Sequence, residues 1–195
     1  MAVAVAGGSE RVWTYDDLKE LPDDGRRWEI IEGMLVEMTG PSWDHATIVQ
    51  RLLMAVVPLV AALGGIVRSA PLDVFLRAGD VVQPDLFVVL PGGVARPTPR
   101  GLEGPPDLVV EVVSPSNRQH DELTKRSLYG LAGVREYWLV DPEARSVEVL
   151  ELHRDAMHLR RRFTEGETVG SPLLPGAAIS LADLFAGTGD SAEGA

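Results

Sequence analysis

Two acidic residues stand in segments that are otherwise apolar. Asp85 directly precedes the run LFVV at 86–89, and Glu111 lies inside the run LVVEVV at 108–113. An unbroken apolar run of this length is typical of a strand that is buried on both faces of a sheet. An ionised carboxylate in such a place is costly unless it is paired or coordinated. We therefore expect each of the two carboxylates to have a compensating partner.

If the two strands are neighbours, these carboxylates meet. Two negative charges about 4 Å apart repel by roughly 4 kcal/mol at an effective dielectric of about 20. The repulsion is relieved if the acids share a proton or if a cation lies between them. Mg²⁺ and Mn²⁺ take oxygen ligands of this kind, often one or two carboxylates completed by water and phosphate. Asp85 and Glu111 are therefore candidate ligands of a divalent metal ion.

Lys125 is the third candidate residue, because it lies on a helix predicted directly after the Glu111 strand. A helix that folds back over its parent strand would bring the ammonium group to the carboxylates. There it could orient an attacking water or stabilise charge on a phosphate. Simpler interpretations stay open. Asp85 could be a turn residue, Glu111 could pair with an arginine, and Asp121 with Lys125 has the spacing of an ordinary surface pair on a helix.

The elements that must position these residues follow from hydrophobic periodicity and turn residues. Helical spacing predicts a short helix after Thr14, a long helix capped by Ser42 or Asp44, a third helix before Gly133, and a last one after Ser180. The two longer helices cover about 45–63 and 118–131. Strand patterns cover 27–31, 34–38, 66–68, 72–76, 81–90, 107–113, 135–140, 146–152 and 158–163, and 91–106 is predicted to be a loop.

This order of elements predicts a mixed α/β or α+β domain. We expect one central mixed β-sheet flanked by helices, with additional antiparallel strands near the C-terminus. The 195 residues are enough for one domain with a substantial core. Residues 11–186 are expected to form that domain, with disordered tails at 1–10 and 187–195.

The composition excludes some kinds of site and weighs on others. The chain has no cysteine, so disulfides, thiolate zinc sites and cysteine nucleophiles are excluded, and its four histidines lack the spacing of a zinc motif. The formal net charge of −11 weighs against binding of nucleic acid through a broad basic surface. It leaves room for an enzyme whose positive charge is a bound metal ion.

No apolar run is long enough to suggest a membrane span, and the N-terminus lacks the basic region of a signal peptide. We therefore expect a cytoplasmic protein that does not contact a membrane. The exposed C-terminal strands could pair across a dimer axis, so a homodimer is a further expectation.

Several segments together resemble the Uma-two family of restriction endonucleases, within the PD-(D/E)XK nuclease superfamily. The resemblance runs from about Tyr15 to Phe185 and is specific in combination, although no single segment is. The segments are WEIIEG at 28–33, His45, QPD at 83–85, PDLVVEVVSPS at 106–116, KRSLY at 125–129, AGVREYWLVDP at 132–142 and SPLLPG at 171–176.

The resemblance implies a restriction-endonuclease-like core in which Asp85 is the first acid of the motif and Glu111 the second. The lysine of the superfamily motif should stand two residues after the second acid, but Val113 occupies that position. The family resemblance therefore points to Lys125 on the following helix. It also implies that the Val112 carbonyl completes the metal site. Glu29 and His45 are secondary candidates for the same cleft.

The function implied is Mg²⁺- or Mn²⁺-dependent hydrolysis of phosphodiester bonds in nucleic acid, with DNA the expected substrate. Arg96, Arg100, Arg118 and Arg126 are candidate contacts to the phosphate backbone. Two alternatives belong to other classes of protein. One is a nuclease fold that binds protein or nucleic acid without cleaving it, and the other is a structural or regulatory oligomer.

Overall fold

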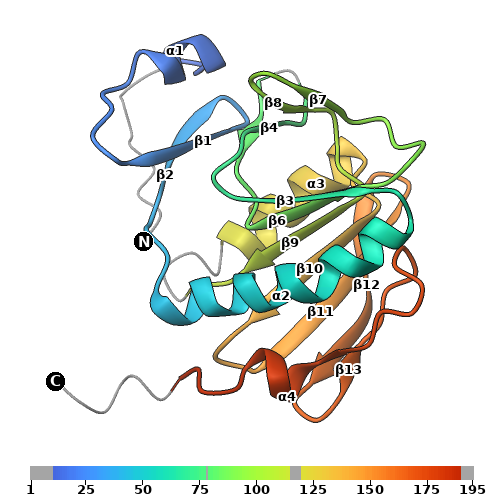
Figure 1. Cartoon of the computed structure of the whole chain (residues 1–195). Helices are drawn as coiled ribbons and strands as arrows, with labels where there is room; N and C mark the ends of the chain where they lie inside the picture. The colour runs from blue at the N-terminus through green and yellow to red at the C-terminus, as the bar shows by residue number, and fades with distance from the viewer. Residues whose placement is uncertain (1–10, 78, 115–119, 190–195) are drawn as a thin grey trace, which may run out of the picture.

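A computed structural model describes residues 11–77, 79–114 and 120–189, except for the side chains of 120–122. The larger of its two main sheets crosses the centre of the molecule (Figure 1). It has six strands, and only β9 and β10 run parallel to each other. The strands lie in the order β12 (Ala156–Thr164), β11 (Ser146–His153), β10 (Glu136–Asp141), β9 (Leu108–Val112), β6 (Leu86–Val89) and β3 (Ile66–Ser69).

A second six-stranded sheet is built from shorter strands and lies over one end of the larger sheet (Figure 1). The sequence predicted one central sheet, so this second sheet is a correction. Its strands lie in the order β2 (Met34–Met38), β1 (Arg27–Ile31), β5 (Val81–Val82), β4 (Val74–Phe75), β8 (Gly101–Glu103) and β7 (Arg96–Thr98).

Helices α2 and α3 lie on opposite faces of the larger sheet, and α1 lies beside β1 and β2 of the second sheet (Figure 1). A two-stranded sheet and the last helix complete the α2 side. The helical elements are α1 (Tyr15–Lys19), α2 (Trp43–Ala62), the π-helical turn η1 (His120–Lys125), α3 (Arg126–Ala132) and α4 (Leu181–Leu184); the small sheet joins β13 (Thr168–Val169) to β14 (Ile179–Ser180).

The predicted architecture of a mixed α+β domain, with a mixed sheet flanked by helices and additional antiparallel strands, is confirmed. The hairpin at 27–38 and the long helix were also predicted correctly. The Ser42 side chain caps α2 by accepting a hydrogen bond from the His45 N–H at 3.2 Å. The helix predicted over about 118–131 consists of η1 followed by α3, and the start predicted at Arg118 lies outside the described residues.

The strand predicted over 81–90 is broken into two strands that belong to different sheets. β5 ends at Val82 in the second sheet, and β6 begins at Leu86 in the larger one. Pro84 lies at the break and has no N–H with which to continue a ladder. The N–H of Gln83 is taken by a side chain, the carboxylate of Glu29, at 2.8 Å. This break sets Asp85 at the entrance of β6.

The segment 91–106 was predicted to be a loop, but it contains the β7–β8 hairpin. Pro97 hid the first strand in the sequence, because proline is unfavourable inside a sheet. It is tolerated here since β7 is an edge strand of the second sheet.

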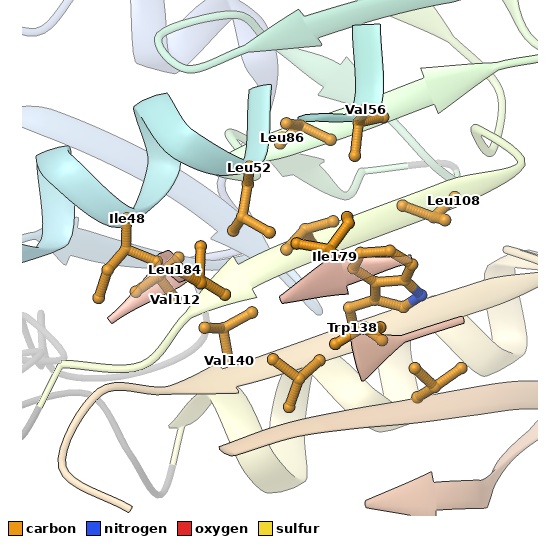
Figure 2. Packing of buried hydrophobic residues seen from close by; sticks show 14 of the residues in the cluster. Ile48, Leu52, Val56, Leu86, Leu108, Val112, Trp138, Val140, Ile179 and Leu184 are labelled. Carbon is orange, nitrogen blue, oxygen red and sulfur yellow. The ribbon is translucent and has the colours of Figure 1, made fainter. Parts of the chain in front are cut away.

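The larger sheet separates two hydrophobic cores, one on each of its faces. On one face, Ile48, Leu52 and Val56 of α2 point toward strands β6, β9 and β10 (Figure 2). The other face is covered by α3 and by the second sheet, around Phe87, Val109 and Tyr129. Successive side chains of a strand point to opposite faces, so each central strand contributes to both cores. The residues of β6, β9 and β10 are therefore apolar except for Glu111, Glu136 and Asp141.

Helix α2 meets the length and composition criteria of a membrane span, with 20 residues and a mean hydropathy of 1.6. The expectation that no segment reaches this length was therefore wrong by that criterion. In the fold its buried residues pack against the larger sheet, and Arg51 donates hydrogen bonds to the carbonyl oxygens of Leu184 and Ala186 at 2.9 and 2.8 Å. In the fold, 22% of this apolar segment is buried.

Candidate active site

The two acids singled out in the sequence lie on neighbouring strands. β6 and β9 are antiparallel, with Leu86 opposite Val110, and Asp85 directly precedes β6 at the end of this pairing. Glu111 points to one face of the larger sheet, because side chains alternate along a strand, and Asp85 lines the same cleft as Glu111. That face is the one that carries Phe87 and Val109, beneath α3 and the second sheet. The predicted pairing of the two strands is therefore confirmed.

Asp85 is held by a backbone donor and by a histidine. Its Oδ2 accepts a hydrogen bond from the N–H of Val112 at 2.8 Å and lies 3.1 Å from His45 Nε2. Burial of His45 opposes its protonation, but the hydrogen bond and the charge of Asp85 outweigh burial and raise the pKa of His45. His45 Nδ1 is buried without a hydrogen-bond partner in the described structure. The secondary candidate His45 thus contacts the first acid directly.

Glu111 is paired with Lys125. The Nζ of Lys125 lies 2.9 Å from Glu111 Oε1 and 3.1 Å from Glu29 Oε1, and its side chain is fully buried. The hydroxyl of Tyr129 donates to the same Glu111 oxygen at 2.5 Å. Two acids and one ammonium group therefore form a buried ion cluster. The interpretation of Lys125 as an ordinary surface residue is wrong, because its buried ammonium pairs with Glu111.

The packing of α3 places Lys125 and Tyr129 over β9. The two residues are four apart, so they share one face of the helix. Gly130 allows a close approach to the start of β12, because a Cβ there would lie 2.9 Å from the Asp155 carbonyl oxygen. Gly133 then ends the helix with a left-handed backbone, φ +93°. Burial raises the pKa of Tyr129 well above its ordinary value, with the charge of Glu111 adding to the effect, so the phenol stays a donor.

Glu29 enters the cluster from the second sheet. It lies on β1, is fully buried, and accepts from the Gln83 N–H at 2.8 Å as well as from Lys125. Its other oxygen, Oε2, is buried and has no hydrogen-bond partner among the residues that the structure describes. The sequence allowed a structural role for Glu29 or a place in the cleft. The structure gives it direct contact with Lys125, which is the main contribution of the second sheet to the site.

A cleft of about 390 Å³ opens over these residues. Asp85, Glu111, Val112, Ser114, His45 and Lys125 all line it, together with the segment that leads into α2. Its remaining wall is Arg27, Met38, Thr39, Gly40, Pro41, Ser42, Asp44, Val113, Pro142, Glu143 and Gly189. The described lining thus contains four carboxylates and two residues with a permanent positive charge.

Sequence reasoning missed two residues of this site, although each had a usable signal. Arg27 stands two positions before Glu29 in one strand, and the two-residue period of a strand places both on one face. Tyr129 stands four positions after Lys125, the spacing of neighbours on a helix face. Both residues could therefore have been inferred once Glu29 and Lys125 had been chosen.

Three of the four arginines expected at the phosphate backbone lie outside the described lining of the cleft. Arg96 donates to the carbonyl oxygens of Gly93 and Ala95, Arg100 pairs with Glu103, and Arg126 donates to the Met157 carbonyl. Arg118 and the side chain of Asp121 lie outside the described residues. The three candidate contacts that can be placed are therefore not supported by the described cleft lining.

The site can accommodate a hard divalent cation through a small set of protein oxygens. Among the described residues, no group of three or more histidine, aspartate or glutamate side chains is arranged to hold a metal ion. Asp85 and Glu111 nevertheless both line the cleft, and among the described residues the hydrogen bonds of Asp85 use its Oδ2. Mg²⁺ is commonly held by one or two carboxylates with water and phosphate. This pair therefore fits such an ion.

The comparison with known proteins agrees with this architecture. The crystal structure of a protein from Anabaena variabilis, described as a putative nuclease of the DUF820 family, superposes with a TM-score of 0.70. The two sequences are 24% identical, and the match covers 89% of this chain and 97% of the other. The fold is thus shared with a protein that is described as a putative nuclease.

The family follows from the sequence match. The model of the Uma2 family, described as "Putative restriction endonuclease", matches residues 15–182. The chain belongs to this family, as the resemblance in its motifs predicted. No curated protein matches the chain at a significant level.

Proposed function

We propose that this chain is a metal-dependent endonuclease that hydrolyses phosphodiester bonds, with DNA as its substrate. The observation that carries the proposal is the meeting of Asp85, Glu111 and Lys125 at the floor of one cleft. The family match supports a nuclease, and the described fold of a nuclease-like relative is consistent with it.

Asp85, Glu111 and the carbonyl of Val112 are the residues that would hold Mg²⁺ or Mn²⁺. When bound, such an ion lowers the pKa of a water ligand and offsets negative charge on the phosphate. Asp85 is prepared for this role, because the Val112 N–H and His45 both hold its Oδ2. Glu111 is held at Oε1 by the Tyr129 hydroxyl and by the Lys125 ammonium.

Lys125 would position the water that attacks the phosphorus. In the reaction the water adds to phosphorus, one phosphorus–oxygen ester bond breaks, and the leaving oxygen takes up a proton. Glu29 and Glu111 hold the ammonium at the cleft through ion pairs of 3.1 and 2.9 Å. Glu29 is therefore a positioning residue for Lys125.

A plasmid-nicking assay with Mg²⁺, with Mn²⁺ and with EDTA tests the proposal. Wild-type protein should convert supercoiled plasmid to the open circle only when metal is present. Asp85→Asn and Lys125→Met should lose nicking by at least about 10²-fold, the usual scale for a catalytic group. Glu136→Gln is the matched control, since it changes a buried acid that does not line the cleft.

Two results of this assay would contradict the proposal. Equal nicking by all four proteins would assign the activity to a contaminant. Nicking that persists in EDTA would remove the metal ion from the mechanism.

A binding module without cleavage is the second candidate, favoured by the acidic lining of the cleft. It predicts a wild-type protein that binds DNA and never nicks it, with either metal. A homodimer is an additional proposal. β12 is a nine-residue strand at the edge of the larger sheet, and a second copy could pair with it. Measurement of the molar mass in solution by light scattering tests this.

A further inference from the structure

Arg27 is a cation of the cleft that is not neutralised by a carboxylate in the described structure. Its side chain is half-buried, and its guanidinium makes one long hydrogen bond, 3.4 Å from Nη2 to the Thr39 carbonyl oxygen. The adjacent Arg26 differs, because it is paired with Asp24 at 2.6 Å. Lys125, the other lining cation, is held by two glutamates. Arg27 is therefore available to an anionic group in the cleft.

Trp43 is an exposed aromatic residue beside this cleft. It is the first residue of α2, with 84% of its surface exposed, and both of its chain neighbours, Ser42 and Asp44, line the cleft. Trp28 and Trp138 are buried, at 9% and 0% exposure. An indole left in water forgoes the stabilisation that burial of its apolar surface would give. An exposed ring next to residues that line a cleft is suited to stack on another flat ring.

The charge of the protein restricts how it can hold nucleic acid. Non-specific binding to duplex DNA depends on many phosphate contacts by basic residues. This chain carries a net charge of −11, and its cleft is lined by more carboxylates than cations. Stacking of bases on aromatic side chains does not depend on charge and provides an alternative source of affinity.

We propose that Trp43 stacks on an unpaired base while Arg27 binds a neighbouring phosphate, so that the site takes single-stranded or locally opened nucleic acid. The base of a paired nucleotide is covered by neighbours on both faces inside a duplex, so an indole cannot stack on it there. The cleft of about 390 Å³ has the size of a small-molecule pocket and suits one or two nucleotides. This inference rests on the proposed nuclease function and names its substrate class.

Fluorescence anisotropy tests the inference with two probes, a fluorescein-labelled oligo(dT) strand and a mixed-sequence duplex of equal length. Binding is measured in EDTA to prevent cleavage, with wild type, Trp43→Ala, Trp43→Phe and Met54→Ala. Met54 is the matched control, because it is also exposed on α2, at 68%, but lies outside the cleft. Wild type should prefer oligo(dT), and Trp43→Ala should weaken that binding by about 5- to 100-fold.

The remaining variants separate the two contacts. Trp43→Phe should keep most of the affinity for oligo(dT), since a phenyl ring also stacks, and Met54→Ala should keep all of it. Arg27→Gln should weaken binding and lower the slope of its salt dependence by about 0.7 for a single strand, the loss of one phosphate contact. Equal binding of oligo(dT) by wild type and Trp43→Ala would overturn the inference.

The plasmid-nicking assay, run on the same proteins, distinguishes this inference from the proposed function. Metal-dependent nicking, together with binding of the duplex that Trp43→Ala does not change, would overturn the inference and keep the proposed nuclease function. Trp43-dependent binding of oligo(dT) without nicking of any substrate would support stacking and overturn the nuclease. If the wild-type protein binds phosphatidylglycerol vesicles but neither oligonucleotide, and Trp43→Ala loses the vesicle binding, the inference is overturned and Trp43 contacts a lipid surface.

Discussion

Two glutamates on neighbouring central strands show why a buried acid is not by itself a site. Glu111 on β9 and Glu136 on β10 are both almost fully buried, and each accepts a short hydrogen bond from an aromatic donor. Glu111 also has the ammonium of Lys125 at 2.9 Å and borders a cleft. Glu136 has neither a basic partner in the described structure nor a place in the cleft lining.

The difference comes from the face of the sheet on which each acid lies. In the parallel register Glu111 is opposite Leu139, so Glu111 shares its face with Tyr137 and Leu139. Glu136 points to the other face with Trp138 and Val140, toward α2. Among the described residues, Glu111 contacts a buried lysine and lines a cleft, whereas Glu136 does neither. Burial raises the pKa of Glu136, although hydrogen bonds that include the one from Trp138 oppose it.

The largest effect is expected from removal of the shared cation. Lys125→Met leaves Glu29 and Glu111 buried without their counter-ion and should lower the free energy of unfolding by about 3–5 kcal/mol. Urea unfolding followed by circular dichroism measures this. Addition of Glu29→Gln to Lys125→Met should recover part of the loss, because one uncompensated charge is then removed. A loss below about 1 kcal/mol would show that the cluster is not ionised.

A smaller loss of stability is expected when the Tyr129 hydroxyl, which donates a hydrogen bond to Glu111, is removed. Tyr129→Phe removes one hydrogen bond to a buried charged oxygen, which should cost about 1–3 kcal/mol of stability. It should also lower the nicking rate, since the carboxylate loses one of its fixed contacts. Thermal unfolding and plasmid nicking report the two quantities. Lost stability with an unchanged nicking rate would mean that Tyr129 serves the fold alone.

The pH dependence of stability should report the ionisation of Glu136, which the described structure leaves without a basic partner. A carboxyl whose pKa is raised by folding binds its proton more tightly in the native state than in the unfolded state. Such a carboxyl lowers the free energy of unfolding as the pH rises above the ordinary pKa of 4.5. Glu136→Gln should therefore be more stable than wild type at about pH 7, where the buried carboxylate of the wild type is charged. The advantage should disappear near pH 4. Denaturant unfolding across this range measures it, and a constant difference would contradict the assignment.

The smallest effect is expected from an exposed ion pair of similar length. Arg160 lies 2.7 Å from Glu151, but 52% of its side chain is exposed. Arg160→Ala should cost roughly 0.2–1 kcal/mol, and the effect should fall at high salt. The comparison with Lys125→Met isolates the contribution of burial. A cost equal to that of Lys125→Met would mean that distance alone sets the strength of these pairs.

The sequence alone determined much of the fold and the identity of the acids. Hydrophobic periodicity and turn residues predicted the hairpin at 27–38, the long helix and the central strands, because these depend on local spacing. An acid inside an apolar strand also identified Glu111. The same criterion applies to Glu136 in EYWLV, and nothing in the local sequence separates the two.

Only the tertiary structure decided which buried acid belongs to a site. The second sheet was not predicted, because its strands are short and pair with partners far away in the sequence, such as β1 with β5. That sheet delivers Glu29, and the fold of α3 over β9 delivers Lys125 and Tyr129. Residues far apart in the chain meet only when strand register and helix packing are set. The charge balance of the cleft is therefore a property of the assembled fold.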